Sequence, residues 1–157
     1  MNKTKIRCTF AGHSEIHNSN LVEAIKTTAK ELITEYGVNE FWVGHYGDFD
    51  HYAAKAVREL KQEYDIELVL VIPYLTKEIE GYKEEYYRNF DAVLMADIPE
   101  KTPKKLKIIK ANQYMVNESE FLICYVKNTW GGAAKTLEYA KKRNIEIFNL
   151  VTVTQSD

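Results

Sequence analysis

Cysteine, proline and glycine are all scarce in this sequence. The 157 residues include 2 Cys, 3 Pro and 7 Gly. The two cysteines, Cys8 and Cys124, stand far apart, each within an apolar segment. This spacing excludes a disulfide framework and does not suggest a zinc site, so we expect two buried free thiols. The sequence also contains no internal repeat, low-complexity tract or linker.

Long apolar runs and an excess of positive charge are missing as well. No stretch approaches the roughly 18 apolar residues of a membrane-spanning helix, and the N-terminus, MNKTKIRCTF, leads into a predicted strand without an apolar export segment. We therefore expect a cytoplasmic protein with no membrane partner. The net charge is −2, which repels polyanions as a whole. Any phosphate binding must be local, and we do not expect nucleic acid as a partner.

The composition is that of an ordinary globular protein. Apolar residues make up 45% of the chain and charged residues 28%, which excludes disorder as its main state. A chain of this length can bury a real core in one domain, whereas two domains would be small. We expect residues 1–157 to form a single domain.

Apolar periodicity predicts strands and helices in alternation. Strands are predicted at 6–10, 41–43, 68–72, 92–95, 121–126 and 145–153. Helices are predicted at about 20–36 and 76–89, and three more follow the second, fourth and fifth strands. Asn20 with Glu23 resembles a capping box, and Gly37 is placed for a left-handed C-cap. Because strands separated by helices need crossover connections, we predict a mostly parallel sheet with helices on both faces.

The segment from Phe121 to Tyr139 is central to the sequence. An uncharged run, 121–126, is followed by a polar bend, Gly131-Gly132 and an apolar helical pattern. A parallel strand covered on both faces gives such a run. Two glycines at a helix start let a ligand approach the first-turn amides, whose partial positive charge suits a phosphate or carboxylate. The alternative is that the glycine pair only makes a tight turn.

Three loops follow predicted strands, at 12–14, 47–50 and 128–132. In a parallel sheet with helices on both faces, ligands bind beyond the carboxyl ends of the strands, where the strand order switches direction. We therefore expect these three loops to meet at one edge of the sheet and to form a pocket there.

The same loops resemble the motifs of a known family. The matching segments are Phe10-Ala11-Gly12-His13, Gly47-Asp48-Phe49-Asp50, Pro73-Tyr74, Asn112-Gln113-Tyr114-Met115-Val116 and Gly131-Gly132. In order and spacing they resemble the SLOG superfamily, and most closely its small stand-alone YpsA-like members. The resemblance covers about residues 6–150 and implies a Rossmann-like three-layer α/β/α fold, with about six strands and a pocket for a nucleotide or nucleotide-derived ligand. More distant relatives are the LOG phosphoribohydrolases, also called lysine decarboxylase-like, and DNA-processing protein A, which holds single strands.

The glycine motif departs from that of the phosphoribohydrolases, which reads Pro-Gly-Gly-x-Gly-Thr-x-x-Glu. The same window here is Trp130-Gly131-Gly132-Ala133-Ala134-Lys135-Thr136-Leu137-Glu138. The glycine pair and Glu138 keep their places, whereas Ala134 and Lys135 replace glycine and threonine. We therefore do not expect catalysis to be inherited with the fold, and whether the chain is an enzyme stays open.

The resemblance and the loop chemistry give a set of candidate site residues. The residues expected to bind ligand are Gly12, His13, Ser14, Gly47, Asp48, Phe49, Asp50, Asn112, Gln113, Gly131, Gly132 and Lys135. Glu138 is the candidate catalytic carboxylate if the chain is an enzyme, since it could stabilise positive charge on a sugar ring. Its alternative is a solvated helix residue. Lys135 either covers a phosphate or pairs with Glu138 at i,i+3.

Several candidates have an ordinary structural alternative. Asp50 begins a predicted helix, so its default role is to cap the first-turn amides. A carboxylate there opposes phosphate, and we expect Asp48 and Asp50 to meet ligand hydroxyls instead. His13 can hydrogen-bond a base or sugar, and Asn112 and Gln113 can read a base edge or bridge the helix. No carboxylate or thiol completes a metal set beside the histidines of the first loop, so we expect neither a metal nor a cofactor.

Aromatic and basic side chains give weaker signals. Tyr74, Tyr82 and Trp130 can stack on a base or belong to the core. A lysine cluster at the predicted fourth helix is typical of a solvated face and alternatively contacts nucleic acid. Its members are Lys101, Lys104, Lys105, Lys107 and Lys110. Tyr86 and Tyr87, expected to be exposed, suggest a homo-oligomer interface.

These observations predict a non-catalytic sensor module that binds a nucleotide-like small molecule. The alternative is a phosphoribohydrolase-like enzyme that cleaves the N-glycosidic bond of a nucleoside monophosphate, with Glu138 as the working carboxylate and the Gly131-Gly132 amides on the phosphate. A third and weaker hypothesis is single-stranded nucleic-acid binding through the lysine cluster.

Overall fold

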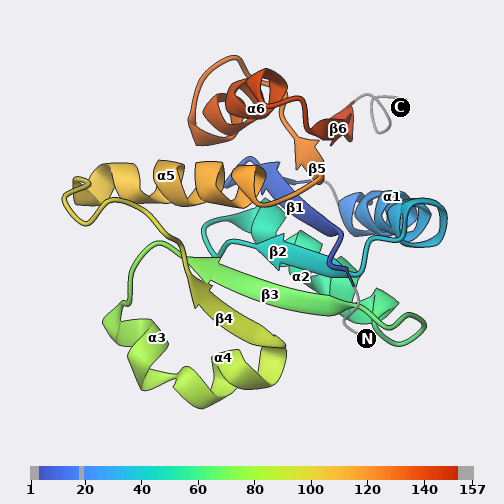
Figure 1. Ribbon diagram of the computed structural model, residues 1–157, viewed down its shortest axis with the longest axis horizontal. Helices are drawn as coiled ribbons and strands as arrows, with labels where there is room; N and C mark the ends of the chain where they lie inside the picture. The colour runs from blue at the N-terminus through green and yellow to red at the C-terminus, as the bar shows by residue number, and fades with distance from the viewer. Residues whose placement is uncertain (1–3, 18–19, 152–157) are drawn as a thin grey trace.

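One sheet of six parallel strands organises the part of the chain that the computed structural model describes, residues 4–17 and 20–151 (Figure 1). The strands are β1 Arg7–Gly12, β2 Glu40–Val43, β3 Glu67–Ile72, β4 Ala92–Met95, β5 Phe121–Tyr125 and β6 Glu146–Asn149. Their order is β4-β3-β2-β1-β5-β6, and every neighbouring pair is parallel. The predicted Rossmann-like sheet is confirmed.

The helices of the described residues cover both faces of the sheet. They are α1 Leu21–Tyr36, α2 Asp48–Leu60, α3 Lys77–Gly81, α4 Lys83–Asn89, α5 Lys104–Asn117 and α6 Gly132–Lys142. Apolar residues of α1 and α2 pack with Phe10, Phe41 and Ile123 on one face, and α5 and α6 cover the other (Figure 1). α3 and α4 pack on β3 and β4 through Ile79 and Tyr86. None of these helices is long and apolar enough to cross a bilayer.

Strand β1 lies inside the sheet and is covered on both faces. Cys8, Thr9 and Phe10 are all buried, although apolar and polar residues alternate here. The Thr9 hydroxyl donates to the Trp42 carbonyl oxygen at 3.0 Å, which satisfies the buried polar group. As predicted, Cys8 and Cys124 are buried free thiols, and burial raises the pKa of Cys124 to about 12.

Two local predictions are wrong. Asn20 has helical backbone angles (φ −88°, ψ −2°) and its side chain makes no cap hydrogen bond, so no capping box forms. The segment 76–89 is two helices with a break after Gly81. The first begins behind Thr76, whose hydroxyl accepts from the Ile79 N–H at 3.1 Å. By contrast, Gly37 is the left-handed C-cap that was predicted, with φ 74°.

The last strand is shorter than predicted, because a side chain takes over the pairing. β6 ends at Asn149, whose side-chain oxygen accepts from the Val126 N–H at 3.2 Å and whose amide donates to the Val126 carbonyl at 3.1 Å. These two hydrogen bonds join Val126, the residue after β5, to the last residue of β6. Residues 152–153 of the predicted strand lie outside the described residues.

Candidate functional site

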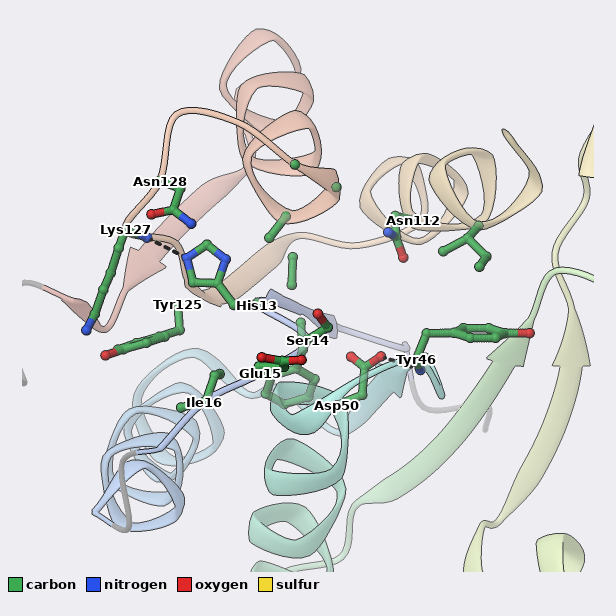
Figure 2. Close-up of a pocket in the computed structure, with 18 of the residues that line it drawn as sticks. His13, Ser14, Glu15, Ile16, Tyr46, Asp50, Asn112, Tyr125, Lys127 and Asn128 are labelled. Carbon is green, nitrogen blue, oxygen red and sulfur yellow. Dashed lines mark hydrogen bonds between the residues drawn. The ribbon is translucent and has the colours of Figure 1, made fainter. Parts of the chain in front are cut away.

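A cavity of about 1250 Å³ opens beyond the carboxyl ends of β1 and β5. The chain moves outward from β1 through β2 and β3 to β4, and then returns to place β5 on the other side of β1. The loops after β1 and β5 therefore lead to helices on opposite faces and leave a crevice between them. The three loops predicted to meet do so around this crevice (Figure 2).

Many of the predicted ligand-binding residues line this cavity. They are Gly12, His13, Ser14, Asp50, Asn112, Gly131 and Gly132. The other candidates, Gly47, Asp48, Phe49, Gln113, Lys135 and Glu138, do not line it. The first three of these lie behind the cavity wall and hold it in shape, as their contacts show.

His13 joins the loop after β1 to the loop after β5. Its Nε2 accepts a hydrogen bond from the Lys127 backbone N–H at 2.8 Å (Figure 2). Nε2 must therefore be unprotonated, and the neutral ring carries its hydrogen on Nδ1. Burial and the positive charge of Lys127 lower the pKa of His13, which favours this neutral form. A neutral donor, Nδ1–H, is thus placed at the cavity.

Asp48 and Gly47 lock the loop after β2 to the loop after β1. The Asp48 carboxylate accepts from the Ile16 N–H at 2.9 Å, and the Asp48 N–H donates to the Ser14 carbonyl at 2.8 Å. Gly47 has φ 127°, and a Cβ there would lie 2.6 Å from the Ser14 Cα. Only glycine fits this crossing. The two residues position Ser14 and Ile16 and are not part of the cavity surface.

Gly12 and Phe49 set the depth of the cavity floor. Phe49 is buried against the core, with its ring edge toward Phe10 at a centroid distance of 6.3 Å. A Cβ on Gly12 would lie 2.2 Å from the Phe49 ring. The backbone of Gly12 therefore rests directly on this ring, which a side chain would prevent. Phe49 supports the ligand-facing backbone from below.

Asp50 does not cap its helix as predicted. Helix α2 begins at Asp48 with Gly47 at the N-cap, which places Asp50 at the third helical position. Its carboxylate reaches back and accepts from the Tyr46 N–H at 3.0 Å (Figure 2). Burial at the base of the cavity raises the pKa of Asp50 to about 6, although the Tyr46 N–H and nearby His51 oppose the rise.

The N-terminus of α6 forms the opposite side of the cavity. Gly131 has φ 93° at the N-cap, and no side chain caps the helix. A Cβ on Gly131 or Gly132 would meet nothing within 4 Å. The first-turn amides, which have no partner inside the helix, are therefore reachable by a ligand. The buried Thr136 hydroxyl donates to the Gly132 carbonyl at 3.0 Å, which holds this turn in place.

Among the remaining candidates, Glu138 and Tyr82 lie away from the cavity and Trp130 lines it. The Glu138 side chain is 66% exposed and pairs with Lys141 at 3.4 Å. Its pairing with Lys135, one of the two roles considered for that lysine, is not found in the described part of the chain. Six residues at 100° each turn Glu138 about 240° from Gly132 around the helix axis. Among the aromatic candidates, Trp130 lines the cavity and is 69% exposed. Tyr82 is exposed on the surface and does not line it.

The lining residues that were not among the predicted ones include the polar side chains of Glu15, Tyr46, Lys127 and Asn128. Lys127 and Asn128 directly follow the apolar run of β5, so their position at a strand end was a usable signal. Tyr46 lies in the loop after β2 and had the same signal. Glu15 lies beyond Ser14 in a loop whose path the sequence does not reveal.

Comparison with known proteins identifies the family. The family model of YpsA, described as the YspA SLOG family, matches residues 9–156. The chain belongs to the YpsA family of SLOG proteins. The resemblance carried by the loop motifs is thereby confirmed. No curated protein matches the chain significantly.

Solved structures share the fold of this YpsA-family chain. DNA processing protein A (DprA) from Streptococcus pneumoniae gives a TM-score of 0.70 at 15% identity, over 92% of this chain and 50% of that one. DprA from Helicobacter pylori, solved for its single-stranded DNA binding mode, gives a TM-score of 0.66 at 15% identity, over 93% of this chain and 65% of that one. The molybdenum cofactor carrier protein from Chlamydomonas reinhardtii gives a TM-score of 0.56 at 14% identity, over 92% of this chain and 75% of that one.

At these identities the likeness shows the fold alone. This chain spans less than two thirds of either DprA chain. The expectation that nucleic acid is not a partner gains no support from the likeness, since one of the fold relatives binds single-stranded DNA.

Proposed function

We propose that this YpsA-family chain is a sensor module that binds a nucleotide or nucleotide-derived small molecule in the cavity between β1 and β5. The observation that carries the proposal is the arrangement of two unlike ends in one cavity. The open helix start at Gly131-Gly132 faces it from one side, and the side chains of His13 and Asp50 face it from the other. The first suits a phosphate, and the second suits the hydroxyl and nitrogen groups of a nucleoside.

The phosphate end is favoured by local charge. The chain carries a net charge of −2, so its overall field does not attract an anion. Lys127 lines the cavity with its ammonium nitrogen 5.3 Å from the centre of the Tyr125 ring, and Asp50 lies at the base of the cavity. The backbone amides of a helix start can hold a phosphate without a strongly basic surface.

The fold relatives support a ligand-binding role. Helicobacter pylori DprA binds single-stranded DNA, and the Chlamydomonas protein carries molybdenum cofactor. The same fold therefore serves proteins with quite different ligands.

The side chains of the cavity favour binding of the ligand without cleavage. The hydrolase alternative relies on Glu138, and the exposed position of that carboxylate outside the cavity gives it no support. Prolonged incubation of the protein with AMP tests this point. We expect no release of adenine or ribose phosphate, and release that is lost in Glu138→Ala would restore the enzyme hypothesis.

A charge placed at Gly132 tests the proposed anion site. Gly132 has an ordinary φ and open space at its Cβ position, so side chains are tolerated there. Gly132→Asp puts a carboxylate where the phosphate is proposed to bind, and Gly132→Asn is a control of the same size without the charge. An acid in the first helical turn stabilises the helix by roughly 0.3–1 kcal/mol, so lost binding will not reflect unfolding.

The assay is a thermal-shift titration with nucleoside monophosphates. Ligand at about 100 times its Kd stabilises the folded protein by roughly 2.7 kcal/mol, and the shift grows with concentration. We expect a shift for the unaltered protein and for Gly132→Asn, and none for Gly132→Asp. Equal shifts in all three proteins, or no shift in the unaltered one, would contradict the proposal.

A further inference from the structure

We infer that the cavity continues along α5 into a surface that binds a single-stranded oligonucleotide. The inference rests on the proposed nucleotide site, which would hold one end of the strand. We name this surface the lysine track, and define it as Tyr46, Tyr74, Lys104 and Lys107. It is a second, adjoining site, because Tyr74, Lys104 and Lys107 do not line the cavity itself.

Helix α5 connects the cavity to the lysine track. Ile108 and Ala111 line the cavity. Lys104 and Lys107 stand four residues before them, and residues four apart are neighbours on one helix face. The face that closes the cavity therefore becomes cationic about 6 Å farther along, just over one turn toward the start of the helix.

Two tyrosines complete the connection at the ends of β2 and β3. Tyr46 lines the cavity, and Figure 2 shows its ring directed away from Asp50, toward the carboxyl end of β3. Burial, together with the neighbouring Tyr74 hydroxyl, raises the pKa of Tyr46 to about 12. The ammonium nitrogens of Lys104 and Lys107 lie 5.3 and 5.7 Å from the centre of the Tyr74 ring. The four side chains thus form one continuous surface.

The two lysines of the track are available to an anionic partner. In the described part of the chain neither forms an ion pair, whereas Lys26, Lys61 and Lys141 each have a carboxylate partner. Their positive charge is instead directed at an aromatic ring that is itself partly exposed. Two cations without acidic partners, in a chain of net charge −2, mark a local site for phosphate groups.

The chemistry of the track fits an unpaired strand in particular. Aromatic rings stack on bases, and lysines follow the backbone phosphates, in proteins that bind single strands. A base must be unpaired to reach a tyrosine ring in this way. With one nucleotide in the cavity, the next phosphates would lie over Lys104 and Lys107, and a following base would stack on Tyr74.

The test compares a mononucleotide with a short strand on charge-reversal variants of the full chain. The probes are thymidine 5′-monophosphate and a 5′-phosphorylated thymidine hexanucleotide, with Kd measured by calorimetry at several salt concentrations. The variant Lys104→Glu/Lys107→Glu removes the track. The control Lys105→Glu/Lys110→Glu makes the same change in net charge on the same helix, at positions about 110° to either side of the track row.

We expect the hexanucleotide to bind the unaltered protein at least roughly tenfold more tightly than the monophosphate. Lys104→Glu/Lys107→Glu should remove this gain and leave the affinity for the monophosphate unchanged. It should also reduce the slope of log K against log salt by about 1.4, or 0.7 for each lost phosphate contact. The control variant should keep most of the gain.

Two outcomes overturn the inference. The first is a hexanucleotide that binds no more tightly than the monophosphate, and the second is an equal loss of affinity in both double variants. In either case the proposed function stands if the monophosphate still binds. Failure of the monophosphate to bind the unaltered protein would instead remove the nucleotide site and, with it, the inference that depends on it.

Discussion

Replacement of Asp50 by asparagine should stabilise the protein at neutral pH. Burial raises the pKa of Asp50 from an ordinary value of 3.8 to about 6. Between pH 3.8 and about 6 the folded protein keeps a proton that the unfolded chain has released. The free energy of unfolding therefore falls as the pH rises through this range. The full loss, 2.2 pKa units at 1.36 kcal/mol each, is about 3 kcal/mol.

Asparagine avoids this loss and keeps the local structure. Its side-chain oxygen can still accept from the Tyr46 N–H, the bond that the carboxylate makes at 3.0 Å. We expect Asp50→Asn to gain up to about 3 kcal/mol at pH 7.5, or roughly 6–12 °C in Tm for a domain of this size. The gain should shrink steadily as the pH falls toward 4, because the folded carboxyl group is then protonated and the unfolded one is about half protonated.

Urea denaturation at pH 4.5, 5.5, 6.5 and 7.5 measures this difference directly. Other titrating groups act on both proteins alike and cancel in the comparison. Glu138→Gln is the matched control, since it makes the same acid-to-amide change at a largely exposed site, where we expect a change within about 0.5 kcal/mol at every pH. A difference for Asp50→Asn that does not vary with pH, or a loss of stability at pH 7.5, would refute the reasoning.

Two further substitutions test the packing below and beside the site. Gly12→Ala forces a Cβ to within 2.2 Å of the Phe49 ring, and we expect it to cost about 1–3 kcal/mol by urea denaturation; an unchanged midpoint would contradict the close approach. Glu40→Ala removes the buried partner of the part-buried Arg7 side chain, which it contacts at 2.6 Å, and should cost up to about 3–5 kcal/mol. Glu67→Ala, an exposed partner of Lys5, should cost under about 1 kcal/mol, and equal costs would argue against burial as the cause.

The sheet could be predicted from the sequence because its strands are buried on both faces. The runs at Leu68–Ile72 and Phe121–Val126 have no polar side to satisfy, so their apolar character identifies them without further information. The site edge follows from the same fact, since residues after such strands must lie at the carboxyl ends. For that reason Gly12, His13 and Gly131 were found at the cavity.

What the sequence did not reveal depends on rotation and on tertiary partners. Asp48 and Asp50 are two residues apart at the start of α2, and from the sequence either could cap the helix. In the structure the Asp48 carboxylate accepts from the Ile16 N–H and the Asp50 carboxylate accepts from the Tyr46 N–H. Ile16 and Tyr46 lie in the loops after β1 and β2, whose paths are set by tertiary packing. Glu138 is different, because helix geometry alone turns it about 240° around the helix axis from Gly132. That rotation argues against a place in the cavity.

In the proposed binding mode, Asp50 also sets the orientation of the nucleotide in the cavity. A carboxylate that weakens the fold and faces a cavity is typical of a functional group. Because the helix start at Gly131-Gly132 attracts an anion and Asp50 repels one, a phosphate has one favourable end of the cavity and one unfavourable end. A ribonucleotide bound in the proposed way would place its 5′-phosphate at α6 and its 2′-hydroxyl group at Asp50, and its 3′-hydroxyl group would lead toward the lysine track. Asp50→Asn should then weaken the discrimination between a nucleoside 5′-monophosphate and a 2′,5′-bisphosphate, which carries a second anion toward Asp50. Thermal-shift titrations of both ligands measure this, and an unchanged ratio of their Kd values would place the second end of the ligand elsewhere.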